Sequence, residues 1–255
     1  MDNQTVLIDN VDAIRILTLN RPKRLNALND NMRDELMSAL FEAQTDNSVA
    51  GMVITGAGNA LSAGADIERF KAAASNKNKN SFKNIVRFVR AFSDFSKPLI
   101  AAINGYAVGW GLTMPLMCDV RLCSENAIFS CGFVRIGVTP EFGSSNLLPR
   151  IIGLGRAMEM VLTARQVTAT EAFDMGLVTQ VTPQDKLMGN ALEMAVKITS
   201  FPEPAVRLSK AVIRHGSQST LDQTLGPESE YFKHAMATPE HLDAVKKMAA
   251  GFNRP

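Results

Sequence analysis

The side chain of Glu141 is a carboxylate that could transfer protons in a reaction. Glu141 stands between Pro140 and Phe142, and apolar neighbours raise the pKa of a carboxyl group toward that of a general base. A Pro-Glu pair is also typical of the first turn of a helix, where glutamate stabilises the helix dipole. Glu141 therefore has two interpretations, a proton shuttle and a structural residue.

Two loops rich in glycine could hold the negative charge that such a proton transfer creates. The first follows the apolar run 99–103 and contains Gly109 and Gly111, and the second, 56–67, follows the apolar run 51–55. Each pattern predicts a buried strand, a loop of small residues and a helix start, which together present free backbone N–H groups. The glycines could also serve only a tight turn or close packing.

The second loop admits two other interpretations. It begins like a dinucleotide-binding fingerprint, but Leu61 occupies the position of the third glycine. Ser62 lies in an A-x-S-x-G pattern that imitates the nucleophile elbow of acyl hydrolases, with Asp119 and His215 downstream in the required order. An elbow follows its strand immediately, whereas here a loop intervenes, so a serine hydrolase is the weaker hypothesis.

The overall composition excludes several classes of function. A formal charge of +2, with 27 basic and 25 acidic residues and no long basic run, argues against nucleic acid and membrane surfaces as partners. Three cysteines without C-x-x-C spacing and three distant histidines predict neither a disulfide framework nor a metal site. No secretory leader or spanning apolar run is evident, so we expect a cytoplasmic protein.

The chain is long enough for one large α/β domain, and its periodicity predicts most elements. A segment rich in Lys and Asn, 71–80, is expected to be a mobile surface loop, either a lid over a ligand or simply disordered. The other expected elements are a hairpin of strands 6–8 and 13–19 broken at Asp9-Asn10, helices 30–46, 81–92 and 169–175, strands 120–123 and 178–181, and C-terminal helices broken at Pro202, Pro204, Gly216, Gly226-Pro227 and Thr238-Pro239.

The chain resembles the crotonase (enoyl-CoA hydratase/isomerase) superfamily. The resemblance rests on the octet 60–67, on the run Asn104-Gly105-Tyr106-Ala107-x-Gly-x-Gly and on Cys118-Asp119, and it extends along nearly the whole chain. It implies an α/β fold, a crotonase-type spiral of strand-strand-helix (ββα) units over 1–200, with a helical C-terminal region, 201–255, for oligomerisation. Its members form homotrimers, often paired as hexamers, and their substrates are acyl-CoA thioesters. Coenzyme A is then part of the substrate, and no separate cofactor is expected.

The resemblance also implies roles for particular residues. The backbone N–H groups of Ala65 and Trp110 match the family's oxyanion hole, although family hydratases usually carry glycine where Trp110 stands. Its indole must enter the core or meet the acyl chain. The positions of the two hydratase glutamates hold Thr113 and Phe133, which cannot transfer protons at neutral pH. The remaining implied contacts are to coenzyme A from Lys23, Arg24, Ala63, Asp66 and Ile67, and to the acyl group from Thr113, Phe133 and Phe142.

Glu141 matches the single catalytic glutamate of peroxisomal-type Δ3,Δ2-enoyl-CoA isomerases, whose Pro-Glu-Gly-x-Ser-Ser run is similar to 140–145 here. The expected reaction is therefore isomerisation of a 3-enoyl to a 2-enoyl thioester, with an enolate intermediate held by the oxyanion hole. The alternatives are a hydratase or another lyase or decarboxylase of the family. Outside the family they are a serine acyl hydrolase and a non-catalytic acyl-CoA binder.

Overall fold

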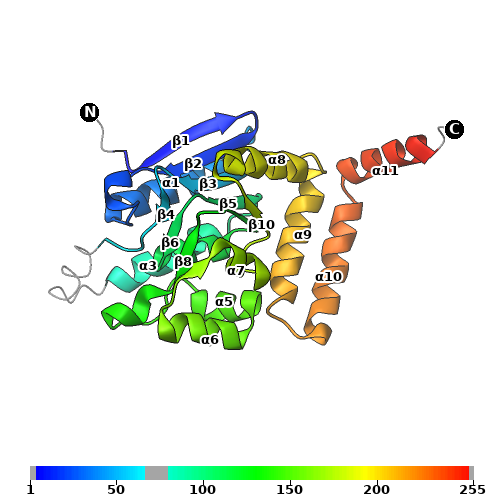
Figure 1. Cartoon of the computed structure of the whole chain (residues 1–255). Helices are drawn as coiled ribbons and strands as arrows, with labels where there is room; N and C mark the ends of the chain where they lie inside the picture. The colour runs from blue at the N-terminus through cyan, green and yellow to red at the C-terminus, as the bar shows by residue number, and fades with distance from the viewer. Residues whose placement is uncertain (1–3, 67–79, 253–255) are drawn as a thin grey trace.

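The chain alternates between two β-sheets as it proceeds. The computed structural model describes residues 4–66 and 80–252 (Figure 1). One sheet has the strand order β1 (Val6–Val11), β2 (Ile14–Leu19), β3 (Gly51–Gly56), β5 (Leu99–Ile103), β7 (Val120–Ser124) and β10 (Gln180–Thr182). The other has the order β4 (Ala60–Ser62), β6 (Tyr106–Val108), β8 (Ile128–Ser130) and β9 (Val167–Thr168). The successive pairs β3/β4, β5/β6 and β7/β8 give one strand to each sheet, which confirms the predicted spiral.

Strand pairing is mostly parallel. Only the outer pairs β1/β2 and β8/β9 are antiparallel within the described residues, and β2, β3, β5, β7 and β10 run in one direction. In the smaller sheet β4, β6 and β8 are parallel too. The loops that leave neighbouring parallel strands therefore emerge at one edge, where a ligand site is expected.

Helices cover both faces of the larger sheet. On one face Ile14, Val53 and Ile100 pack against α8, and on the other a larger core joins the sheet to α1 and α3. Alternate residues of one strand thus point into different cores. The helices are α1 (Asp30–Thr45), α3 (Asn80–Ser93), α4 (Trp110–Thr113), α5 (Ser144–Ile152), α6 (Leu154–Thr163), α7 (Ala169–Asp174), α8 (Leu187–Thr199), α9 (Glu203–Gly216), α10 (Leu221–Met236) and α11 (Pro239–Phe252), with 3-10 turns η1 (Pro22–Arg24), η2 (Pro115–Met117), η3 (Gly132–Ile136) and η4 (Gln184–Lys186).

Three predictions of local structure were wrong. The first hairpin turns at Asp12, which adopts a positive φ of 51°, and β1 continues through the predicted break at Asp9-Asn10. The segments 60–62 and 106–108 form short strands rather than loops leading directly into helices. Helix α10 continues through Pro227, supported by the capping box that Thr220 forms at its start and by its packing on α9. Residues 71–79 of the predicted mobile loop lie outside the described residues.

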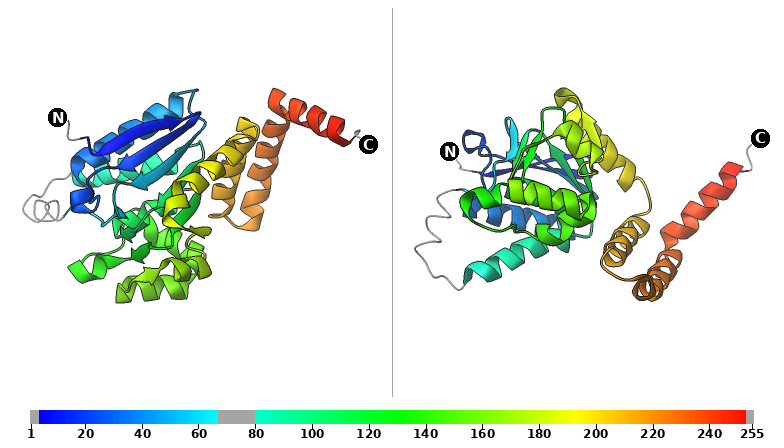
Figure 2. Two further views of the ribbon diagram at one scale, coloured as in Figure 1. Left: turned by 45° about the horizontal axis from the view of Figure 1, so that its top comes forward. Right: turned by 60° about the horizontal axis from the view of Figure 1, so that its bottom comes forward.

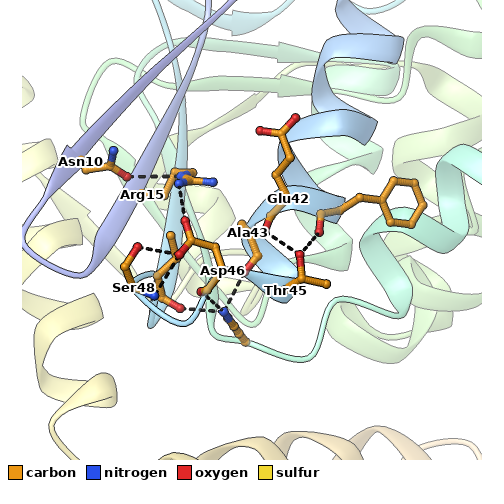
Figure 3. Close-up of polar contacts among 10 residues, drawn as sticks. Asn10, Arg15, Glu42, Ala43, Thr45, Asp46 and Ser48 are labelled. Atoms are coloured by element: carbon orange, nitrogen blue, oxygen red, sulfur yellow. Dashed lines mark hydrogen bonds and ion pairs between the residues drawn. The ribbon is translucent and has the colours of Figure 1, made fainter.

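The turn from α1 into β3 is fixed by Asp46 (Figure 3). Its carboxylate accepts hydrogen bonds from the Ser48 hydroxyl (2.6 Å) and amide (2.9 Å) and from Arg15 of β2 (3.0 Å). The hydrogen bonds from Ser48 are the main cause that holds the pKa of Asp46 below its ordinary value. The turn thereby fixes the start of β3 beside β2.

The C-terminal helices are attached to the sheets through α9, while α10 and α11 project away from them (Figures 1 and 2). The Asp119 carboxylate pairs with Lys210 (2.7 Å) and Arg214 (2.9 Å) of α9 and accepts from the Leu99 amide (2.8 Å). Burial lowers the pKa of Lys210 to about 8, although Asp119 opposes this shift. No helix in the described ranges has the length and apolar character to cross a bilayer.

We expect Asp119→Asn to lower the free energy of unfolding by about 2–3 kcal/mol, because Lys210 and Arg214 would lose their common anion in a poorly hydrated setting. Denaturant titration measures this loss. Glu203→Gln, which breaks the exposed pair between Glu203 and Arg207 on the same helix, is the matched control and should cost less than about 0.5 kcal/mol. Equal effects of the two substitutions would contradict the role given to Asp119.

The three buried cysteines predict a loss of stability in alkaline solution. Burial raises the pKa of Cys118, Cys123 and Cys131 to about 12. Unfolded thiols ionise first as the pH rises past 9, so the folded state holds more protons and the free energy of unfolding falls by about 1.4 kcal/mol per thiol per pH unit. Lys210 has a lowered pKa, so its titration raises the free energy of unfolding as the pH rises. This effect involves one proton, whereas the three thiols involve three protons.

Chemical unfolding measured at intervals of half a pH unit above pH 9 tests this expectation. Cys123→Ala should make the decline about half as steep between pH 9 and 10.5, where Lys210 offsets one of the three thiols, and about a third less steep above that range. A wild-type stability that stays constant or rises over this range would contradict the burial of the thiols.

Candidate functional site

Two loops meet at the ends of the neighbouring parallel strands β4 and β6. A Cβ atom placed on Gly64 would lie 3.1 Å from the carbonyl oxygen of Val108 and 3.8 Å from the amide nitrogen of Trp110. The structure therefore brings Ala65 and Trp110, the two predicted oxyanion donors, to one place.

The amide of Ala65 is turned away from its neighbour Leu28. In the parallel bridge between these residues, the Leu28 amide donates to Gly64 O (2.8 Å) and the Asp66 amide donates to Leu28 O (2.9 Å). The N–H of Ala65, which lies between these two bonded groups, points to the opposite side of the extended chain. It has no acceptor among the described residues.

The amide of Trp110 is available for a different reason. Trp110 is the first residue of α4, so its N–H has no partner within the helix, and the amides of Leu112 and Thr113 share the carbonyl of Gly109. Gly109 adopts a φ of 54° and ψ of −118°, which turns the chain from β6 into the helix. Because α4 has a single turn, its dipole is small, and the direction of the N–H groups is the important feature.

A close backbone contact fixes the separation of the two loops. A Cβ atom on Gly111 would lie 2.1 Å from the carbonyl oxygen of Ser62, so no other residue fits without moving α4 from β4. Two buried side-chain amides, to which the sequence alone gave no structural role, hold the preceding loop: Asn26 donates to Ala57 O and Ala60 O, and Asn104 donates to Gly56 O and Gly58 O. Asn104 directly follows the apolar run 99–103, which is a signal that could have identified it, whereas Asn26 stands in a polar stretch without such a signal.

Glu141 lies in a loop that ends before α5 begins at Ser144, so it is not in the first turn of that helix. The residue is exposed, contrary to the apolar surroundings that we expected to raise its pKa. Its carbonyl oxygen accepts from the amide (3.1 Å) and hydroxyl (2.6 Å) of Ser144. The Glu141 main chain is thus held by the start of α5.

The three residues predicted to line an acyl pocket are all buried. Thr113 and Phe142 belong to the core, and the ring of Phe133 lies 3.9 Å from the position of a Cβ on Gly109. Trp110 places its indole in the same core, 2% exposed and stacked on Phe88, so the core alternative for this side chain is confirmed. The Nε1 of Trp110 and the Oγ1 of Thr113 have no hydrogen-bond partner in the described part of the chain.

The residues predicted to contact coenzyme A form a second group near the segment 63–66, which follows β4. The Ala63 amide donates to Leu25 O (2.8 Å), which joins the loop to η1, where Lys23 and Arg24 are exposed. Asp66 pairs with Arg21 (2.8 Å), a residue that we had not singled out. Ile67 lies outside the described residues.

The serine hydrolase hypothesis is wrong. The hydroxyl of Ser62 is buried and donates to Asn26 O (2.8 Å), while Asp119 binds α9, and the His215 ring approaches Ser219 on the exposed end of that helix. No triad is assembled. Residues 4–66 and 80–252 also contain no group of three His, Cys, Asp or Glu side chains able to hold a metal ion.

Gly111→Ala should destabilise the protein by about 1–3 kcal/mol or more, since the added methyl group meets a fixed carbonyl. Gly189→Ala in α8 is the matched control, because its Cβ would meet nothing within 4 Å. That change should raise the free energy of unfolding by about 0.5–1 kcal/mol. Thermal and denaturant unfolding provide the comparison, and unchanged stability in Gly111→Ala would contradict the close contact with Ser62.

Comparisons with known proteins agree with this arrangement. The family model "Enoyl-CoA hydratase/isomerase" matches residues 9–250. The chain is 36% identical to the short-chain-enoyl-CoA hydratase of Clostridium acetobutylicum, over 96% of this chain and 94% of that protein. It is 32% identical to the crotonyl-CoA hydratase of Syntrophomonas wolfei, over 96% and 95%.

Solved structures show the same fold. The crystal structure of an enoyl-CoA hydratase from Bacillus anthracis superimposes with a TM-score of 0.90 at 31% identity, covering 97% of each chain. These relatives are named hydratases, so the prediction that the chain is closest to isomerases is not supported at that finer level. The match along the chain, the two alternating sheets and the paired backbone donors lead to one conclusion: the chain belongs to the enoyl-CoA hydratase/isomerase (crotonase) family.

Proposed function

We propose that the chain transforms enoyl thioesters of coenzyme A through an enolate whose oxygen binds the amides of Ala65 and Trp110. One observation carries this proposal: the two amides lie close together at the ends of β4 and β6. Neither amide has a hydrogen-bond acceptor among the described residues. Two directed N–H groups stabilise an oxygen that becomes anionic, and loss of one such donor typically costs about 3–4 kcal/mol of transition-state stabilisation.

Hydration of a 2-enoyl thioester is the first candidate reaction, because the relatives at 32–36% identity are named hydratases. Thr113 and Phe133 cannot exchange protons there, so Glu141 would have to serve both proton transfers. It would take a proton from water as the water oxygen bonds to C3 and the C2–C3 π electrons move toward the thioester. The protonated Glu141 would then give that proton to C2 as the enolate collapses, which leaves the carboxylate as it began.

Isomerisation of a 3-enoyl thioester is the second candidate, and the single carboxylate at 141 favours it. Glu141 would remove a proton from C2, the electrons would form the enolate, and the same proton would return to C4 as the double bond moves into conjugation. Both reactions use one proton shuttle and one oxyanion hole. They differ only in the second atom that Glu141 must reach, a water oxygen or C4.

We assign the coenzyme A portion to the surface beside the segment 63–66, which follows β4. Lys23 and Arg24 are exposed on η1, and their positive charges suit phosphate groups. Ala63 and Asp66 lie on the adjoining extended segment, beside which the rest of the coenzyme A portion would lie.

The C-terminal helices are assigned to assembly as a homotrimer or a hexamer. Helices α9 and α10 bury no residue completely, and an apolar groove of about 490 Å³ runs between them. Large apolar side chains of α10 and α11 are exposed, which favours burial against another copy: Leu221, Leu225, Phe232, Met236, Leu242, Val245 and Met248.

The decisive experiment follows the ultraviolet absorbance of the conjugated thioester with 2-enoyl-CoA and, separately, with 3-enoyl-CoA. A hydratase removes absorbance from the first substrate, and an isomerase creates absorbance from the second. Glu141→Gln should lower the rate of either reaction by about 10²–10⁴, because it removes the proton shuttle. The control Glu193→Gln, an exposed position on α8, should leave the rate unchanged.

Three results would contradict the proposal. Full activity of Glu141→Gln would exclude Glu141 as the shuttle. Binding of both thioesters without turnover would indicate a non-catalytic binder. Release of free coenzyme A as the main product would indicate thioester hydrolysis instead.

A further inference from the structure

The residue after Glu141 has an unusual backbone conformation. Phe142 adopts a φ of 56°, and Gly143 follows with a φ of 74°. Glycine enters this left-handed region freely, whereas a bulky side chain does so only when its surroundings compensate. The isomerase run described above has glycine at this position, so phenylalanine here requires a physical reason.

The ring of Phe142 supplies that reason, since it is buried in a cluster of four aromatic rings. Its centroid lies 5.1 Å from that of Phe88 and 5.6 Å from that of Phe92, both on α3, in edge-to-face geometry. It lies 6.3 Å from the indole of Trp110, with the planes at 89°. Only 3% of Phe142 is exposed. Edge-to-face contacts of this kind are favourable beyond the burial of area alone.

The rest of the loop is seated on the same part of the molecule. A Cβ on Gly143 would lie 2.8 Å from Met117 Cε, so the loop rests on η2, the turn that follows α4. Ser144 holds the carbonyl of Glu141 through two hydrogen bonds. The main chain at 141 therefore has one anchor in α5 and another in the aromatic cluster.

Trp110 belongs to the proposed oxyanion hole and also contacts the loop that carries Glu141. Its backbone gives an oxyanion N–H, and its side chain packs against Phe142, the immediate neighbour of the proposed base. The two rings are thus a direct packed connection between the oxyanion hole and the Glu141 main chain.

We propose that Phe142 is a positioning residue, and that its contact with the Trp110 indole sets the distance from the Glu141 carboxylate to the oxyanion hole. This inference rests on the proposed function of Glu141. An error of about 1 Å in such a position can cost on the order of 10²-fold in rate. The effect should fall mainly on kcat, because the Phe142 ring is packed among Phe88, Phe92 and Trp110 and is only 3% exposed, so that its loss displaces the Glu141 main chain.

The experiment combines Phe142 substitutions with Glu141→Gln and measures kcat and KM on whichever enoyl thioester the wild type converts. Phe142→Gly removes the ring but relaxes the backbone, whereas Phe142→Leu keeps an apolar side chain. We expect each to lower kcat by about 10–100-fold, with KM changed by less than about threefold. Phe142→Met, which keeps most of the volume, should recover part of the loss.

The Glu141→Gln background separates positioning from folding. If Phe142 acts through Glu141, adding a Phe142 substitution to Glu141→Gln should change kcat little. The kcat of the double variant should be less than about threefold below that of Glu141→Gln alone. Leu36→Ala in α1, a fully buried residue of the same core, controls for lost stability and should leave kcat near the wild-type value in the folded enzyme.

Trp110→Phe tests the contact from its other side. The substitution keeps the backbone N–H, and the indole Nε1 has no partner to lose among the described residues. It should lower kcat in the manner of Phe142→Leu, with the same dependence on Glu141.

Two outcomes would overturn the inference. One is an equal fractional loss of kcat from Phe142→Leu with and without Glu141. The other is an unchanged kcat in a folded Phe142→Gly variant. A wild-type rate in Glu141→Gln alone would instead overturn the proposed function, so the two failures are distinguishable.

Discussion

The contact between Gly111 and the carbonyl of Ser62 is the constraint on which the rest of the site depends. It leaves no room for a side chain and thus sets α4 directly against β4. Pairing of β4 with β6 then brings Ala65 and Trp110 together, and the amides of Asn26 and Asn104 prevent the preceding loop from shifting. The donors are main-chain groups held by main-chain packing, so their direction is set before a substrate arrives, which is the requirement for electrostatic stabilisation of an oxyanion.

Helix α4 and the turn η2 that follows it also connect the site to the C-terminal helices. After α4 the chain passes through η2, and there Arg214 of α9 donates to Met117 O (2.8 Å) and pairs with Asp119. Met117 in turn contacts the loop that carries Glu141. A displacement of α9 would therefore reach both the oxyanion segment and the Glu141 loop through a few packed residues.

Much of the fold could be predicted from the sequence, because long apolar runs and helical periodicity are local signals. Strands β3, β5 and β7 and helix α1 lie where the pattern placed them. The short strands β4 and β6 could not be predicted in this way, since segments of three residues have no usable periodicity and exist only through pairing with each other and with β8. The turn at Asp12 and the passage of α10 through Pro227 were missed for a related reason: pairing and packing overrode the local preference.

The individual residues of the site could be predicted from the sequence, but the contacts between their side chains could not. Glycine spacing and the resemblance to the family indicated Ala65, Trp110 and Glu141, and the structure brings the first two together. The contact of Phe142 with Trp110 was not predictable, because it joins residues that are distant in the sequence through side chains that stand where the family patterns resembled by this sequence have glycine.

That contact bears on how one carboxylate could do the work of two. In a site with two glutamates, each group needs the right position for only one proton. A single carboxylate must reach both C2 and a second atom, so a small displacement impairs two steps rather than one. Glu141 is exposed and lies in a loop, which by itself gives little rigidity. Phe142, a left-handed residue whose ring is packed against three other rings, supplies rigidity beside it, at the cost of backbone strain that only tight packing can compensate. The aromatic residues at 110 and 142 therefore form one packed unit, which in our proposal couples the base Glu141 to the oxyanion hole.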